Sequence, residues 1–203
     1  MKKTLFLLAI AAASFVIVKC GNAENSNENK SGTAYLTDSA IYNLHLLKGA
    51  DYAKQTGAVL IKNVTDAITE KGAEYAIGFC NTKALPLTDS MGKVQNISIK
   101  RVTDKPRNPS NLANTEELQY IRLLKNAAAA GEKPGPQLQE IDGKIVGYYP
   151  IITNDMCMQC HGEKSLMAAE LSAKLNKLYP ADLATGYKPN ELRGLWVIEM
   201  MKE

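Results

Sequence analysis

Two cysteines and a histidine lie within five consecutive residues, Cys157-Met158-Gln159-Cys160-His161. Two thiols at this spacing can each add across one vinyl group of a haem, and the adjacent imidazole is then held beneath the iron. The pattern is typical of c-type haem attachment. It predicts one covalent haem c, with Cys157 and Cys160 as the thioether residues and His161 as an axial iron ligand. Such attachment requires an oxidising compartment, so the motif also predicts export.

Two other chemistries are compatible with the same residue types. Cys80, Cys157, Cys160 and His161 together match the ligands of a structural Cys₃His zinc site. Cys157 and Cys160 alone would suit a thiol–disulfide oxidoreductase, although no βαβ unit is evident ahead of the pair. Colour separates the alternatives, because neither a zinc site nor a dithiol absorbs visible light as a haem does.

Cys80 is the one cysteine that neither the leader nor the motif uses. A lone cysteine is often a small buried hydrophobe, but here it is also a candidate for the second axial ligand. His45 is the alternative ligand, and Met91 is a weaker one. With both axial positions filled, no open site remains for oxygen or peroxide. We therefore expect low-potential electron transfer or redox or gas sensing, and no enzymatic activity.

Several further residues are candidates for the surroundings of a haem. Aromatic and aliphatic side chains in the C-terminal third would form walls of the pocket, unless they simply pack in the core. Arg101 and Arg107 are candidates to pair with the propionates, unless they are solvated loop residues. The candidate wall residues are Tyr148, Tyr149, Ile151, Trp196 and Ile198.

Residues 1–23 have the pattern of a secretory signal peptide. Lys2 and Lys3 precede a 14-residue apolar run, which is shorter than the ~20 residues of a membrane span. Cleavage after Ala23 predicts a periplasmic protein, whereas lipidation of Cys20 would make a membrane-anchored lipoprotein. Three of the 24 Lys and Arg residues lie in this leader, so the rest carries as many bases as the 21 acids. No nucleic-acid partner is expected.

After the leader we expect a flexible tether over 24–33 and one domain over 34–203. Apolar periodicity predicts a helix over 35–54, which Gly57 interrupts or ends, and a second helix over 61–81. Asn114 and Glu117 predict the capped start of a helix that runs to 130. Asp142-Gly143 predicts a hairpin between strands over 138–141 and 144–152. With strands over 94–102 and 195–200 and a helix over 168–178, the class is α+β.

The sequence resembles the small single-haem, PAS-like c-type proteins, whose domain was long catalogued as of unknown function and also forms the sensing region of some bacterial histidine kinases. The resemblance implies an antiparallel sheet flanked by N-terminal and crossing helices, with one covalent haem. It also implies His161 and Cys80 as the iron ligands. A redox partner protein or a small gas ligand would be the partner, and the oligomeric state is not predicted. Besides the motif, the matching segments are 76–80, Arg101, 107–111, 149–152, 179–182, 185–187 and 192–194.

Overall fold

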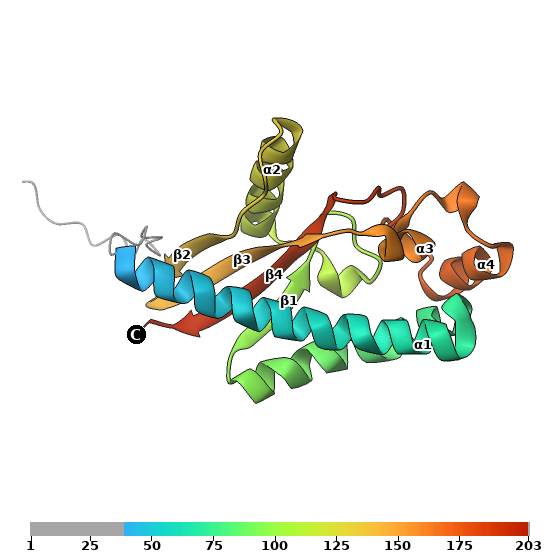
Figure 1. Ribbon diagram of the computed structural model, residues 1–203, viewed down its shortest axis with the longest axis horizontal. Coiled ribbons are helices and arrows are strands. Elements are labelled where there is room, and N and C mark those ends of the chain that lie inside the picture. The colour runs from blue at the N-terminus through green and yellow to red at the C-terminus, as the bar shows by residue number, and fades with distance from the viewer. Residues whose placement is uncertain (1–38, 203) are drawn as a thin grey trace, which may run out of the picture. The chain divides into compact units, whose positions relative to one another are not determined.

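The computed structural model describes residues 39–202 (Figure 1). The expected signal peptide, the tether, the boundary at residue 34 and Cys20 all lie outside the described residues. Among the described residues, no helix combines the length and the apolar character that a membrane crossing needs.

Helix α1 (Ser39–Gln95) is two helical halves joined at Gly72, which has φ 83° and ψ 165°. Only glycine adopts this backbone region readily, so the chain turns back there. The halves run antiparallel (Figure 1), and the Thr56 hydroxyl donates to Gln95 Oε1 at 3.3 Å between them. The prediction that Gly57 ends the first helix is wrong. Gly57 lies within the helix, and a Cβ there would be in ordinary van der Waals contact, 3.8 Å, with the Trp196 indole nitrogen.

Four antiparallel strands form the sheet in the order β1-β4-β3-β2. Asp142 and Gly143 both have positive φ, 49° and 74°, as a type I′ turn requires, so the predicted hairpin is confirmed. Strand β4 begins three residues before its predicted start and pairs with both β1 and β3. The strands are β1 (Ser98–Val102), β2 (Gln137–Ile141), β3 (Lys144–Ile152) and β4 (Leu192–Met201).

Each face of the sheet carries its own apolar core. Helix α2 (Thr115–Ala129) packs on one face, and its start is the predicted capping box: Asn114 accepts from the Glu117 amide at 2.9 Å, and Glu117 accepts from the Asn114 amide at 2.8 Å. Helix α1 covers the other face, where the core includes Ile145, Tyr149, Trp196 and Ile198. The α+β class is therefore confirmed, with helices on both faces of an antiparallel sheet.

Strand β3 leads directly into the Cys-x-x-Cys-His segment. That segment is formed by the 3₁₀ turn η2 (Asp155–Cys157) and the one-turn helix α3 (Met158–His161). After the turn η3 (Lys164–Leu166), helix α4 (Ala169–Leu178) packs against the second half of α1. Ile77, Leu171, Leu175 and Tyr179 form this contact, which places the second half of α1 beside the motif.

Candidate functional site

A cavity of about 290 Å³ lies between the two halves of α1, the sheet and the Cys-x-x-Cys-His segment. Its wall is mostly apolar, which suits a flat organic group with a few directed polar contacts. The predicted wall residues Ile151 and Trp196 do line it. The apolar side chains from α1 that line it are Leu60, Ile61, Val64, Ile68, Ala76, Ile77, Ala84 and Leu85.

Cys80 and the three reactive residues of the motif all line this cavity. Cys80 comes from the second half of α1, one helical turn after Ala76 and Ile77, which are almost fully buried. Cys157, Cys160 and His161 come from η2 and α3, which the connection from β3 presents to the same space. The fold therefore brings together a thiol and an imidazole that lie far apart in the sequence.

The His161 ring is held in one tautomer by the backbone. Its Nδ1 donates to the Ala184 carbonyl at 2.7 Å, because a carbonyl oxygen can only accept. Burial, together with the charges of Arg107 and Arg193, lowers the pKa of His161 well below the ordinary value of 6.5. The imidazole is therefore neutral, and its Nε2 keeps a lone pair for a metal ion. Hydrogen bonding of the second ring nitrogen is how metal-binding histidines are commonly oriented.

A short loop holds the backbone of the motif from the other side. The Gly186 amide donates to the Gly162 carbonyl and the Tyr187 amide to the His161 carbonyl, each at 2.9 Å. The Tyr187 ring meets the His161 ring edge-on at 6.4 Å. Positive φ at Gly186, 76°, permits the close turn. Sequence reasoning quoted residues 185–187 as part of the resemblance but gave them no role.

Burial raises the pKa of both Cys80 and Cys160, while Arg101 and Arg107 act in the opposite direction on Cys80. A thiol–disulfide oxidoreductase needs an attacking thiol with a lowered pKa. The half-buried Cys160 is therefore a poor attacking thiol. Cys157 is contacted by Asn154, whose side-chain oxygen lies 3.2 Å from the sulfur and accepts from the Cys157 amide at 3.3 Å.

The zinc alternative requires four ligands to converge on one point. Within the part of the chain that the structure describes, no three His, Cys, Asp or Glu side chains are gathered closely enough to hold a metal ion. Cys80, Cys157, Cys160 and His161 line one cavity without meeting at its centre. The Cys₃His zinc prediction is therefore not supported by the geometry.

Arg107 is a buried arginine that organises the motif. It forms an ion pair with Asp182 at 3.0 Å, and its Nη2 also donates to the carbonyls of Cys160 and Ala184. Asp182 in turn accepts from the Ala184 amide at 2.8 Å. Arg107 lines the cavity as predicted, but its guanidinium holds protein groups. The sequence gave Asp182 and Ala184 no role, because nothing local marks them as its partners.

Arg101 differs from Arg107 because no acidic side chain among the described residues forms an ion pair with it. It lines the cavity from β1, its Nε is buried without a hydrogen-bond partner, and its guanidinium lies 5.6 Å from the Trp196 ring. Arg193 is a third arginine in the cavity wall, which the sequence analysis missed as a site residue. Its Nη1 donates to the Thr103 hydroxyl and the Lys105 carbonyl.

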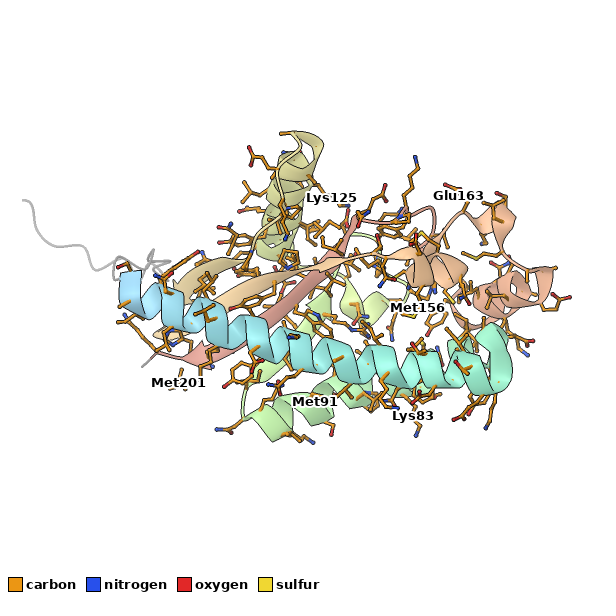
Figure 2. All side chains as sticks on the ribbon, in the orientation of Figure 1. Lys83, Met91, Lys125, Met156, Glu163 and Met201 are labelled. Carbon is orange, nitrogen blue, oxygen red and sulfur yellow. The ribbon has the colours of Figure 1, made fainter. Side chains whose placement is uncertain are left out.

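Other predicted residues lie outside the cavity wall. The Tyr149 hydroxyl donates to the His45 carbonyl at 3.0 Å, so this side chain packs against α1 in the core. His45 is fully buried with its ring nitrogens 2.9 and 3.0 Å from the carbonyls of Ile41 and Met201, which leaves no nitrogen for a metal. Three further candidates also lie elsewhere: Tyr148 stacks on Tyr120, Ile198 is in the core, and Met91 lies on the second half of α1 (Figure 2).

The fold and the site define an α+β protein with an apolar cavity behind a Cys-x-x-Cys-His motif. The chain belongs to the Tll0287-like family, whose sequence model matches residues 22–200. It is also similar in structure to the crystal structure of the cyanobacterial heme-protein Tll0287, with a TM-score of 0.57 and 18% identity, over 78% of this chain and 96% of that chain. No curated protein matches the sequence. The family resemblance and the fold expected from it are confirmed.

Proposed function

We propose that this chain is an exported c-type protein with a single covalent haem, acting in low-potential electron transfer or in redox or gas sensing. The observation that carries the proposal is the common cavity of Cys80, Cys157, Cys160 and His161. The donor set fits haem: two thiols at the attachment spacing, a neutral imidazole with Nε2 available, and apolar walls. The structural relative described as a heme-protein supports the same conclusion.

In this proposal His161 and Cys80 are the two axial ligands, and Cys157 and Cys160 hold the haem covalently. When bound, haem supplies a one-electron redox centre. Bound to the iron, a Cys80 thiolate would donate electron density to it, would favour the ferric state and would keep the potential below that of a His/Met cytochrome. The Ala184 carbonyl keeps His161 in the ligating tautomer, and the aliphatic wall from α1 limits access of water.

Two filled axial positions favour a carrier or sensor over an oxidase or peroxidase. Release of Cys80 on reduction would open a position for nitric oxide or carbon monoxide, which is how the same site would serve sensing. The periplasm is the proposed location, with a lipoprotein anchored through Cys20 as the alternative. A redox protein or a small gas is the proposed partner.

The test is to produce the full chain with and without a haem-attachment system. The exported product should keep its Soret band after acid–acetone extraction, and its mass should equal the processed chain plus one haem. Cys157→Ala and Cys160→Ala should each weaken attachment. Lys83→Gln changes an exposed residue and keeps every cysteine, so it is the control and should mature normally. A colourless, zinc-loaded product would overturn the proposal.

A further inference from the structure

The charges around the cavity do not balance. Three guanidinium groups line it, from Arg101, Arg107 and Arg193, while none of the described residues that line it is an aspartate or glutamate. Asp182 compensates Arg107 directly. Arg101 and Arg193 are partly buried and form no ion pair with a described carboxylate, and such an excess of positive charge in an apolar wall is costly unless an anion completes it.

Arg101 is the most incomplete of the three. None of its nitrogens makes a hydrogen bond or ion pair with another described residue, and its Nε is shielded from solvent. Its one directed contact is with the Trp196 ring, at 5.6 Å from the ring centroid. A guanidinium presents several donors in a planar fork that matches a carboxylate, so the missing partner has a defined chemistry.

The position of Arg193 adds a second charge to the same locus. Burial lowers the pKa of Arg101, and the positive charge of Arg193 lowers it further. The two guanidinium groups therefore repel each other. The Arg193 guanidinium lies 5.2 Å from the centroid of the Tyr187 ring, and while burial lowers the pKa of Arg193, the Tyr187 side chain raises it. Of these two guanidiniums, only that of Arg101 makes no hydrogen bond with another described residue, so Arg101 is the donor that a carboxylate ligand would complete.

We propose that Arg101, supported by Arg193, is a carboxylate-binding residue of the cavity and that its ligands are the propionates of the covalent haem. This inference rests on the proposed function. The vinyl and propionate substituents occupy opposite edges of the macrocycle, so bonds to Cys157 and Cys160 turn the propionates away from the motif and toward other walls. Arg101 lines the cavity from β1 and not from the motif. Arg107 is excluded from this role because Asp182 and two carbonyls already occupy its guanidinium.

The experiment compares mature holoprotein carrying Arg101→Gln with the wild type and with Lys83→Gln. Lys83 is an exposed cation on α1, three residues after Cys80, so its variant removes the same charge from the surface (Figure 2). The reduction potential is measured from pH 5 to 9. Pairing with arginine should keep the propionates ionised through most of this range, and its loss should raise their apparent pKa by about 1–3 units.

We expect Arg101→Gln to lower the reduction potential at neutral pH and to move its pH-dependent change to higher pH. Lys83→Gln should change neither property. Arg101→Lys should restore the charge and part of the wild-type profile. Equal profiles for Arg101→Gln and Lys83→Gln would overturn the inference. If the reduction potential changed with chloride concentration at constant ionic strength, the ligand of Arg101 would be a free anion. That result would also overturn the inference.

Two further readouts separate other causes. If Arg101 acted on the Cys80 sulfur, Arg101→Gln would alter the low-spin spectrum without shifting the pH dependence, which would again contradict the propionate assignment. Haem content, measured by mass before each titration, identifies failure of the proposed function itself. Protein that carries no haem in any variant would show that failure, whereas fully loaded variants with unchanged profiles would show failure of the Arg101 inference alone.

Discussion

Arg107 and Asp182 form a buried ion pair, with 3.0 Å between Nη2 and Oδ2 and less than a tenth of either side chain exposed. The pair ties the loop after β1 to the loop after α4, and through the Cys160 carbonyl it also fixes the motif. Removing one member leaves the other as an uncompensated buried charge. The pair is therefore a structural anchor for the residues that line the cavity.

Arg107→Ala should lower the free energy of unfolding by about 3–5 kcal/mol, because Asp182 would remain buried without a partner. Urea denaturation of the matched proteins measures the change. Lys144→Ala is the control, since Lys144 and Glu199 form an exposed pair at 3.3 Å whose loss should cost less than about 1 kcal/mol. Similar costs for the two variants would show that the buried pair contributes no special stability.

Cys80→Ala should open the second axial position. The oxidised protein should change from a low-spin thiolate–imidazole spectrum to a high-spin or water-ligated one, with a higher potential and faster binding of added ligands. Absorption and paramagnetic resonance spectra measure this. His45→Ala should leave the spectrum unchanged, because both of its ring nitrogens contact carbonyls outside the cavity. The reverse pattern would make His45 the ligand and remove the basis for a low-potential centre.

Gly72→Ala should destabilise the turn between the halves of α1 by about 1–3 kcal/mol, because its φ of 83° is unfavourable for any residue with a Cβ. Gly78→Ala is the matched control in the same helix. An added Cβ at Gly78 meets no atom within 4 Å and needs no positive φ, so it should stabilise the helix by up to about 1 kcal/mol. Thermal denaturation should give shifts of opposite sign, and equal shifts would refute the assigned role of Gly72.

Gly49 provides the space for Tyr149, because a Cβ at Gly49 would collide with the phenol ring. Gly49→Ala should cost about 1–3 kcal/mol through overpacking. Tyr149→Leu should lose the hydrogen bond to His45 and part of the core packing. In the double variant the leucine side chain makes room for the new Cβ. The double variant should therefore lose less stability than the sum of the two single variants, by about 0.5 kcal/mol or more. Strict additivity in urea denaturation would show that the two residues do not compete for one space.

Local patterns in the sequence predicted the parts of the fold that depend on near neighbours. The capping box of Asn114 and Glu117 and the Asp142-Gly143 turn each satisfy backbone groups within four residues. The break in α1 was misplaced because a helix tolerates a glycine whose φ and ψ stay helical. Gly57 passes over Trp196, whereas Gly72 has the positive φ that actually turns the chain.

The candidate site was predicted where one motif defines it and missed where distant loops complete it. Tyr149 and Ile151 share a face of β3, but only Ile151 reaches the cavity, because the cavity occupies one end of that face. The alternation of side chains along a strand predicts which face of the sheet a residue lies on, but not which residues of that face reach the cavity. Asp182 pairs with Arg107 and Arg193 donates to Thr103, and in each case the partner lies more than 70 positions away, which a single sequence does not reveal.

The separation of Cys80 from His161 along the chain has a thermodynamic consequence. If iron joins them, the Fe–S bond closes a covalent circuit of about 80 residues through the haem and the motif, much as a disulfide would. In the unfolded state such a closure removes chain entropy worth about 4.5 kcal/mol. Breaking the Fe–S bond on reduction would then reopen the circuit, so the ferrous protein would resist denaturants less well than the ferric protein, although both keep the haem attached.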